Sequence, residues 1–467
     1  MGNRTRDGLA VVLTDVVARS ARAAGYRATT LPGVVAERLS PRITSRIAAA
    51  ASAVVVVSGT NGKTTTTRLI VDLLEAAGRR TISNPSGANL LAGVTSMFIA
   101  HRAALSAADA PIVVLEVDEM SLDRVASQVP IHVLVATNLV RDQLDRYGET
   151  DAVTQRWRPV IRDLVAESTL VVCADDPRLM HLAAGATART QTFGLAEAPA
   201  ESSADPALTP EAVACPACDG PLARRWVGLG HLGDFTCTRC SFERKRPSIA
   251  VRVGESHDFA ETHMTLLDAA SGTEQSLTLA MPGVSNAYNA VAAVTAVVAL
   301  GVPFRSAAES LSGLRPPWGR YERLDIDGRE VILSLGKNPA SVAELVRIGA
   351  SADVDTVVVG VNDAVADGRD ASWYWDVDLA PLLAGRQFLL TGTRRLDLAL
   401  RLKYSAVYAQ HTSSPADATV DSPADALSRM VAATPPGGRV FVVLTYTALL
   451  ELRSALAARM LLSPMPA

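Results

Sequence analysis

Two glycines, a lysine and a run of threonines stand close together early in the chain, within residues 59–66. Glycines let backbone N–H groups crowd around phosphate oxygens, and a lysine adds a positive point charge. A threonine hydroxyl at the start of a helix can ligate a magnesium ion. The two glycines are three residues apart, closer than in the usual phosphate loop. The residue types still predict a nucleoside triphosphate site formed by Gly59, Thr60, Asn61, Gly62, Lys63, Thr64 and Thr65.

The segments on either side of this loop predict a strand and a helix. Residues 54–57 are consecutive valines, a β-branched run typical of buried strands. Residues 66–78 have helical periodicity, with Leu69, Ile70 and Leu73 on one face. The loop is therefore expected to join the end of a strand to the start of a helix.

Three more apolar runs alternate with helical segments, and strands are expected at residues 112–117, 132–136 and 170–173. This alternation predicts a parallel sheet covered by helices, with ligands at the carboxyl ends of the strands. Carboxylates in such a place can hold magnesium. We expect the polar segments after these strands to share one site: Glu116, Asp118 and Glu119, then residues 137–148 beginning with Thr137 and Asn138, then Asp175 and Asp176.

Four of the five cysteines form two Cys-x-x-Cys pairs separated by eighteen residues. This spacing is typical of a tetrahedral zinc site with no open position, so we expect a structural zinc ribbon at about residues 212–246. Arginines make the ribbon basic, but no aromatic stacking pattern accompanies them, which disfavours nucleic-acid binding. The fifth cysteine, Cys173, is predicted to be buried in a strand. The predicted zinc ligands are Cys215, Cys218, Cys237 and Cys240.

The second half of the chain predicts another α/β domain. Asn286 and Asn289 lie three residues apart at the start of an alanine- and valine-rich helix, so both can face one side of it. Prolines then mark a boundary near residue 315, and apolar runs resume. Strands are expected at residues 331–335, 356–361, 387–391 and 439–444.

These elements predict an α/β protein in three parts. Residues 1–50 are expected to be helical, with a break at residues 31–33. Residues 51–315 form the ATP-binding domain that carries the ribbon, and residues 316–467 form a Rossmann-like domain. The net charge of −3 gives no reason to expect nucleic acid. No secretory signal is evident, and the longest apolar stretch is too short to span a bilayer. We expect a cytoplasmic protein.

Taken together, these motifs resemble the Mur ligase superfamily, ATP-dependent ligases of peptidoglycan synthesis and cell wall biogenesis. The resemblance covers residues 50–460 and depends on the phosphate loop, Glu116, Thr137-Asn138 with Asp142, the helix start at residues 286–289, and Gly319-Arg320. Within the superfamily the chain is most similar to the ligase subunits of lipid II isoglutaminyl synthases. That similarity depends on the four-cysteine ribbon and on residues 338–340 and 362–376.

The resemblance implies a carbon–nitrogen ligase with a definite reaction. ATP would phosphorylate the α-carboxylate of D-glutamate in the lipid II stem peptide, and ammonia would attack the acyl phosphate to give D-isoglutamine. Thr64 and Glu116 would hold Mg²⁺, and the ATP contacts would come from residues 59–65, Asn286, Asn289 and Arg320.

Several departures from the general ligase pattern favour ammonia as the nucleophile. Gln143 stands where many of these ligases have a metal-binding histidine, and Ser334 stands where an aspartate is usual. The carbamylated lysine of the superfamily has no obvious counterpart, because the central domain contains only Lys63 and Lys245. We infer that binding of an amino-acid substrate has been given up.

The resemblance also implies a heterodimer with GatD, a glutamine amidotransferase that supplies the ammonia. GatD-like partners bring a cysteine and a histidine and take the third, orienting carboxylate from the ligase chain. By motif register we assign this role to Asp363, with Asp367 or Asp370 as alternatives if Asp363 only caps a turn. The protein would then reach the membrane through its lipid II substrate.

Two other functions remain open at this point. One is a ligase of the same superfamily that adds an amino acid, as folylpolyglutamate synthases do; the missing lysine and the extra ribbon count against it. The other is an ATP-gated zinc-ribbon protein that regulates through nucleic acid. Both Lys63 and Glu116 are present, which favours catalysis over such a role.

Overall fold

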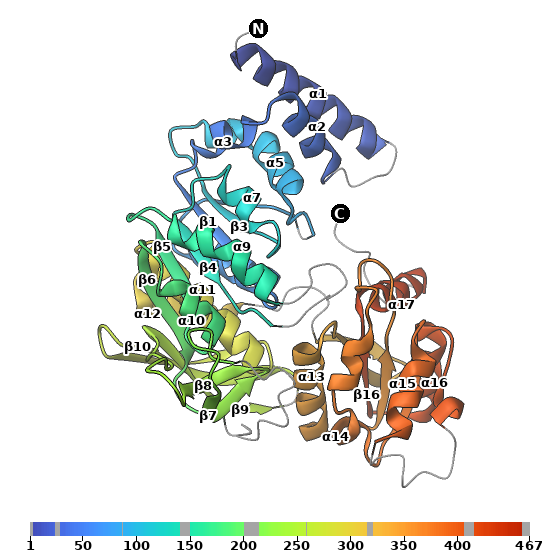
Figure 1. Ribbon diagram of the computed structural model, residues 1–467. Coiled ribbons are helices and arrows are strands. Elements are labelled where there is room, and N and C mark those ends of the chain that lie inside the picture. Colours follow the sequence, from blue (N-terminus) through green and yellow to red (C-terminus); the bar gives the residue numbers. More distant parts are fainter. Residues whose placement is uncertain are drawn as a thin grey trace.

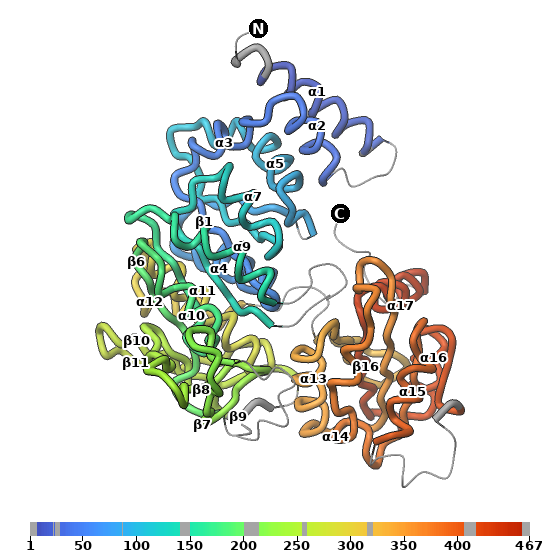
Figure 2. Tube along the Cα trace, in the orientation of Figure 1, coloured from blue at the N-terminus to red at the C-terminus, as the bar shows by residue number. Residues whose placement is uncertain are grey.

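The structure, a computed structural model, describes residues 3–23, 29–85, 87–140, 150–199, 214–257, 259–314, 321–405 and 415–459 (Figures 1 and 2). It contains two α/β domains, each built on its own sheet, and three N-terminal helices that extend from the first domain (Figure 1). The α/β fold expected from the sequence is confirmed. The expected boundary at residue 315 lies outside the described residues.

The central domain is built on a nine-stranded sheet in the order β11-β10-β9-β6-β5-β4-β1-β3-β2. β1 (Ala53–Ser58) lies between β3 (Ile112–Glu116) and β4 (Val133–Ala136), and all three are parallel. Their apolar residues are buried because helices cover both faces. β6 and β9 are also parallel neighbours, whereas β10 and β11 are antiparallel. The other strands are β2 (Thr81–Ser83), β5 (Thr169–Cys173), β6 (Arg189–Leu195), β9 (Ile249–His257), β10 (Glu261–Asp268) and β11 (Thr273–Leu279).

Helices cover both faces of this sheet. On one face α4 (Lys63–Ala76) packs against α11 (Val284–Ala299). α4 begins three residues before the predicted position, because Gly62 adopts a left-handed conformation and starts the helix at Lys63. Cys173 is fully buried on β5, as predicted. The remaining helices of the domain are α5 (Leu91–Ala100), α6 (Arg102–Leu105), α7 (Leu122–Ala126), α9 (Thr150–Arg162), α10 (Pro177–Ala183), α12 (Phe304–Ser310) and the 3₁₀ turn Leu311–Gly313.

The N-terminal segment contains α1 (Asn3–Ala23), α2 (Leu31–Leu39) and α3 (Ile43–Ala48). The predicted break at residues 31–33 is wrong, because these residues form the first turn of α2. Proline is tolerated there, since its missing N–H would have no partner inside the helix. No helix in the described parts of the chain is long and apolar enough to cross a membrane.

The four clustered cysteines flank a two-stranded hairpin: two precede its first strand, one ends its second strand and one follows it. The hairpin consists of β7 (Leu222–Leu229) and β8 (Leu232–Cys237). In the sequence it lies between β6 and β9, which are adjacent strands of the central sheet. This hairpin fits the predicted ribbon.

The C-terminal domain has a five-stranded sheet in the order β12-β13-β16-β14-β15, parallel except for the edge strand β12. Side chains of α13 and α15 pack on one face, and those of α16 and α17 pack on the other. Its elements are β12 (Glu322–Ile326), β13 (Arg329–Leu335), α13 (Pro339–Ser351), β14 (Thr356–Gly360), the 3₁₀ turn η3 (Ser372–Asp376), α14 (Ala380–Leu383), β15 (Gln387–Thr391), α15 (Arg395–Lys403), the 3₁₀ turn Pro415–Ala418, α16 (Pro423–Ala433), β16 (Arg439–Leu444) and α17 (Tyr446–Ala458).

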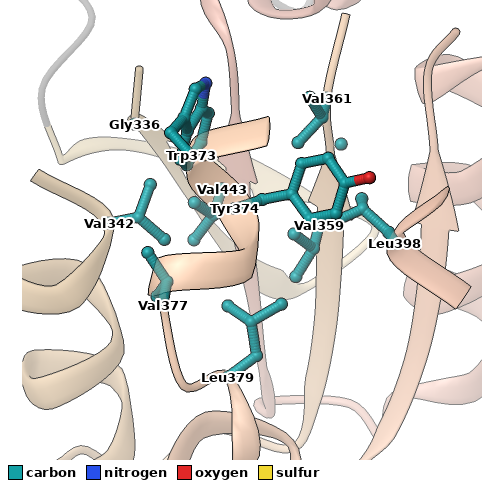
Figure 3. A pocket seen from close by; sticks show the side chains of 11 residues that line it. Gly336, Val342, Val359, Val361, Trp373, Tyr374, Val377, Leu379, Leu398 and Val443 are labelled. Carbon is teal, nitrogen blue, oxygen red and sulfur yellow. The ribbon is translucent and has the colours of Figure 1, made fainter. Parts of the chain in front are cut away.

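A small apolar pocket lies inside the C-terminal domain, where Trp373 and Tyr374 of η3 approach Val359 and Val443 (Figure 3). Apart from its aromatic rings the lining is aliphatic or glycine, without the convergent polar groups that a ligand site needs. We interpret it as a packing gap. Tyr374 is buried there and packs η3 against residues of β14 and β16.

The two domains contact each other through a buried aromatic side chain. Phe259, in the turn between β9 and β10, packs its ring 4.6 Å from that of Phe441 on β16, measured between centroids. Phe259 is 1% exposed and belongs to the hydrophobic core of the C-terminal domain. Glu344 of α13 also accepts a hydrogen bond from the backbone N–H of Ser285 at 2.7 Å. The C-terminal domain is therefore fixed against the start of α11.

Candidate active site

The phosphate loop joins β1 to α4, as predicted, and two of its positions require glycine. Gly59 and Gly62 have φ values of 138° and 85°. A Cβ atom on Gly59 would lie 2.1 Å from Thr137 Oγ1, and one on Gly62 would lie 2.1 Å from Asn289 Oδ1. Any side chain here would push these partners away, so the loop can close around phosphate oxygens only with glycine at both positions.

Asn138, at the end of β4, holds the loop in shape. Its Nδ2 donates to the Asn61 carbonyl and its Oδ1 accepts from the Asn61 N–H, both at 3.0 Å. Thr137 Oγ1 donates to the same carbonyl at 2.8 Å. The Thr60 N–H donates to the Asn138 carbonyl at 2.8 Å. The predicted convergence of the segment after the third strand on the loop is therefore seen for Thr137 and Asn138.

Lys63 is buried beside carboxylates. Its Nζ donates to Glu119 Oε2 at 2.8 Å, to the Thr60 carbonyl at 3.0 Å and to the Gly59 carbonyl. Burial lowers the pKa of Lys63, but Glu119, Asp118 and Glu116 outweigh it and raise that pKa above the ordinary lysine value. The ammonium group therefore stays charged.

Glu116 ends β3 and lies near the start of α4. Its carboxylate is buried and accepts from Asn89 Nδ2 at 3.4 Å. Asn84 pairs with both the N–H and the carbonyl of Glu116 at 2.9 Å, which fixes the strand end. Buried carboxylates at residues 116, 118 and 119, together with the Thr64 hydroxyl, are oxygen donors of the kind that Mg²⁺ prefers. Glu116 and the Thr64 hydroxyl are thus donors of a kind that fits a magnesium ion.

Glu119 is the residue that sequence reasoning did not single out. The sequence predicts it only as one of three carboxylates near the phosphate loop, whereas in the structure it is the carboxylate that pairs with Lys63. Trp157 Nε1 donates to its backbone carbonyl at 2.8 Å and so places the residue. Its spacing, three residues after Glu116, was the available signal.

Asn286 and Asn289 lie behind the phosphate loop, at the start of α11. Asn289 Nδ2 donates to Asn286 Oδ1 at 3.3 Å, and Asn289 Oδ1 accepts from Thr66 Oγ1 at 3.4 Å. Both predicted residues thus come next to the loop. Four other residues that the sequence singled out, Asp142, Gln143, Gly319 and Arg320, lie outside the described residues.

The C-terminal domain reaches the phosphate loop through Asn338. Asn338 Nδ2 donates to Asn61 Oδ1 at 2.9 Å, and Asn61 Nδ2 donates to Asn338 Oδ1 at 3.4 Å. Asn338 also caps α13 by accepting from the Ser341 N–H at 3.0 Å. The N-terminus of α13, with its positive partial charge, therefore lies beside the loop.

The segment after β5 joins this site only in part: Asp176 Oδ2 accepts from the Leu139 N–H, next to Asn138, at 2.8 Å, whereas Asp175 bonds elsewhere. Asp175 accepts from Arg244 Nε at 2.7 Å and from the Tyr288 hydroxyl at 2.6 Å. Burial raises the pKa of Asp175 despite Arg244. Asp176 caps α10, and its Oδ2 lies 3.4 Å from His231 Nε2 of the hairpin. Both carboxylates are used to anchor the ribbon, because Arg244 and His231 belong to it.

The four ribbon cysteines meet as predicted. Their Sγ atoms all lie within 4.8 Å of one another. Burial raises the pKa of Cys237, but hydrogen bonds from the N–H groups of Arg239 and Cys240 lower it below the ordinary cysteine value. Four converging thiols fit a tetrahedral zinc ion with no open position.

The three aspartates considered for the partner's active site have different surroundings. Asp367 is 4% exposed and accepts from the N–H and hydroxyl of Thr447. Asp370 accepts from the Ser372 N–H at 2.9 Å. Asp363 follows β14 and keeps 30% of its side chain exposed; it accepts from Thr393 Oγ1 at 2.8 Å and forms an ion pair with Arg394 Nε at 2.9 Å.

Asp363 is held as a carboxylate. The hydrogen bond from the Thr393 hydroxyl lowers the pKa of Asp363; burial opposes it, and the positive charge of Arg394 adds to the lowering, so the net shift is downward. The neighbouring residues 364–366 are exposed. Asp363 is therefore both charged and near the surface.

The chain is similar to known proteins along most of its length. Residues 57–214 match the Mur ligase middle domain, and residues 335–449 match the MurT ligase C-terminal family. The chain is 31% identical to the lipid II isoglutaminyl synthase (glutamine-hydrolyzing) subunit MurT of Staphylococcus aureus strain COL, over 86% of this chain and 89% of that one. Its identity to the MurT subunit of Streptococcus pneumoniae strain ATCC BAA-255 / R6 is 29%, over 93% of each chain.

Solved structures of peptide ligases and Mur ligases share the fold. A pseudomurein peptide ligase type C from Methanothermus fervidus superposes with a TM-score of 0.66 at 19% identity, covering 87% of this chain and 79% of that one. MurF ligase from Thermotoga maritima, in complex with ADP, has a TM-score of 0.59 at 14% identity, covering 89% and 83%. These likenesses concern the architecture, in which the two α/β domains correspond.

Proposed function

This chain belongs to the MurT family of Mur ligases, and on that premise we propose that it is the ATP-dependent ligase subunit of a lipid II isoglutaminyl synthase. It amidates the α-carboxylate of D-glutamate in the stem peptide of lipid II and forms D-isoglutamine. The observation that carries the proposal is the 31% identity over 86% of the chain to a MurT subunit. The phosphate loop with its buried lysine and carboxylates supports it.

ATP binds with its phosphates against the loop. The backbone N–H groups at residues 59–65 and the N-terminus of α4 face the phosphate oxygens. Lys63 exchanges Glu119 for a phosphate oxygen, and its raised pKa keeps the charge available. Thr64 and Glu116 would hold Mg²⁺, which supplies further positive charge against the phosphates. Asn286, Asn289 and Arg320 complete the proposed nucleotide contacts.

Activation of the substrate is needed because a carboxylate is a poor electrophile and hydroxide is a poor leaving group. Transfer of the γ-phosphoryl group to the carboxylate oxygen makes an acyl phosphate. Ammonia then attacks the carbonyl carbon, the C–O bond to phosphate breaks, and inorganic phosphate leaves with the bonding electrons. Lys63 and the loop N–H groups stabilise the charge that develops on the phosphate.

The ammonia comes from a GatD-type glutamine amidotransferase, which forms a heterodimer with this chain. Free ammonia is scarce at neutral pH because most of it is protonated. Asp363 orients the histidine of the partner and stabilises its charged form. Its exposure and its depressed pKa support this assignment over Asp367, which is buried and bonded to Thr447.

Apolar side chains near Asp363 form a candidate contact surface for this partner. Leu396 and Leu400 lie four residues apart on α15, and both are exposed. Arg401 lies over the ring of the exposed Trp375, 5.8 Å from its centroid. Arg394, two residues before Leu396, forms an ion pair with Asp363 and so connects the surface to the proposed triad residue. We call Val365, Trp375, Leu396, Leu400 and Tyr404 the partner surface.

Zinc has a structural role in this proposal. The four thiolates would hold it, and it would fix the base of the β7–β8 hairpin. The protein acts at the cytoplasmic face of the membrane, where ATP is available, and reaches that face through its lipid-linked substrate.

Amide formation on a D-glutamate-containing muropeptide lipid tests the proposal. The assay supplies ATP with either ammonium chloride at alkaline pH or glutamine plus the amidotransferase. We expect turnover with ammonium chloride alone, and with glutamine only when the partner is present. Incorporation of a free amino acid with no response to ammonia would overturn the proposal and leave only the ligase fold.

A further inference from the structure

α1 exposes an apolar stripe to solvent. Leu9, Val12, Leu13 and Val16 have the spacing of one helix face, and they are 47%, 59%, 38% and 51% exposed. The other side of α1 is already used, because Ala10 is fully buried where the helix packs on α2. An amphipathic helix with a second, uncovered apolar face is typical of a surface that contacts something else.

The N-terminal segment that carries this stripe has an excess of positive charge. The first 50 residues contain eight arginines and three acidic residues, a net charge of +5, whereas the whole chain has a net charge of −3. Arg19, Arg38 and Arg42 are exposed in this segment. The two acidic residues of α1 are paired, Asp7 with Arg46 and Asp15 with Arg102. A binding partner with complementary charge would therefore present a negatively charged surface to this segment.

The stripe is connected to the proposed active site by packed helices. The Gly33 N–H of α2 donates to Ser96 Oγ of α5 at 2.7 Å. A Cβ on Gly33 would lie 1.8 Å from the Ala92 carbonyl oxygen, so the two helices are in direct contact. α5 begins two residues after Asn89, whose side chain donates to Glu116. Figure 1 shows α1 at the end of the molecule away from the C-terminal domain.

We propose that α1 lies flat on an anionic lipid bilayer, with Leu9, Val12, Leu13 and Val16 in the headgroup and acyl boundary and the arginines against lipid phosphates. This inference deepens the proposed function, because it explains how a chain acting on a lipid-linked peptide holds that peptide near Glu116. A second copy of the chain is a poor occupant, since two surfaces of the same positive charge repel.

Flotation of the purified full-length chain with vesicles tests the proposal without any substrate. We expect the chain to float with phosphatidylcholine vesicles that contain about 30% phosphatidylglycerol, and to float much less with phosphatidylcholine alone. Raising the salt to about 0.5 M should weaken the binding, because the electrostatic part is screened. Equal binding to both kinds of vesicle, or none to either, would overturn the proposal.

Two single substitutions identify the surface. Val12→Asp and Val16→Asp are expected to lower vesicle partitioning by about tenfold or more, because each removes an apolar anchor and adds a repelled charge. The matched control is Val165→Asp, which changes an equally exposed valine (60%) in the turn before β5 and should leave partitioning unchanged. All three positions are exposed, so thermal unfolding should stay near wild type.

The remaining outcomes separate the alternatives. If the chain does not float and instead dimerises through a contact that Val12→Asp abolishes, a second copy covers the stripe. If Val12→Asp prevents association with the amidotransferase, the stripe belongs to that interface. If the chain floats with vesicles but does not amidate the substrate, the membrane-binding proposal stands and the proposed function is rejected. If it amidates the substrate but does not float, the proposed function stands and the membrane-binding proposal is rejected.

Discussion

Asn61 of the phosphate loop and Asn338 at the N-terminus of α13 hydrogen-bond to each other across the two domains, at 2.9 and 3.4 Å. Asn61 is in turn held by Asn138 of the central sheet. The loop that would carry ATP is thus bonded to both domains. A movement of either domain can therefore be transmitted to the phosphate loop directly, through the hydrogen bonds of Asn61.

Asn338→Ser should separate the effect of losing the contact with Asn61 from the effect of losing the cap of α13. Serine still caps α13, so the free energy of unfolding should change by less than about 0.5 kcal/mol. Its side chain is too short to reach Asn61, so kcat/KM for ATP in the ammonia-dependent reaction should fall about tenfold. Asn338→Ala should show the same kinetic loss and a further destabilisation of about 1 kcal/mol. Wild-type kinetics for Asn338→Ser would show that the contact is not used in turnover.

Lys63→Met should lower kcat/KM by about 10²- to 10³-fold, because it removes the charge that stabilises the transferring phosphate. Lys403→Met, at the exposed end of α15, is the control and should retain full ammonia-dependent activity. The comparison is made at saturating Mg²⁺. Equal activity of the two variants would remove Lys63 from the proposed mechanism.

The Lys63–Glu119 pair also predicts an alkaline dependence of stability. The pKa of Lys63 is raised in the folded protein, so the pair contributes stability that is fully present below the unfolded lysine pKa of about 10.4. That contribution is lost as pH rises through the higher folded value. Urea unfolding across this window should show an alkaline decline in the wild type that is smaller in Glu119→Gln. Parallel curves for the two proteins would contradict the shift.

Asp363→Asn should lower the rate of glutamine-dependent amidation by the complex about 10³- to 10⁴-fold, because the partner histidine loses its orienting carboxylate. Amidation with ammonium chloride should be unaffected, since Asp363 is not part of the ATP site. Asp370→Asn is the matched control and should preserve both reactions. The assignment fails if Asp363→Asn keeps the glutamine route while Asp367→Asn or Asp370→Asn loses it.

Zinc removal should destabilise the central domain. A chelator, or Cys218→Ser with Cys240→Ser, should lower the unfolding free energy by about 3 kcal/mol or more and release zinc. ATP hydrolysis should also fall, because His231 of the hairpin pairs with Asp176, which accepts from the Leu139 N–H beside Asn138. Val365→Asp, a surface substitution remote from the ribbon, serves as the comparison for stability. Metal-free protein of unchanged stability would exclude a structural zinc.

The parts that sequence could predict are those whose signals are local. The valines of β1 and the apolar runs of its neighbours specify buried strands, and glycine, lysine and threonine in one short segment specify the phosphate loop. The cysteine spacing likewise predicts the cluster without reference to the rest of the chain.

The parts that sequence could not predict depend on contacts between distant residues. Asp175 and Tyr288 are 113 positions apart, and Asn61 and Asn338 are 277 apart. An aspartate after a strand has the same local pattern whether it binds a ligand or an arginine from an inserted hairpin. Only the folded arrangement shows that Asp175 takes the second role.

The four-cysteine ribbon has a topological consequence. β6 and β9 are parallel neighbours, so the chain that leaves the end of β6 must travel back along the sheet before β9 can begin. Parallel pairs need a crossover connection of about a dozen residues or more, which is usually a helix. Here that crossover includes the ribbon. A shortened enzyme made by joining Leu195 directly to Ile249 would therefore lose the β9–β11 edge of the sheet, and with it the turn that seats Phe259 in the second domain.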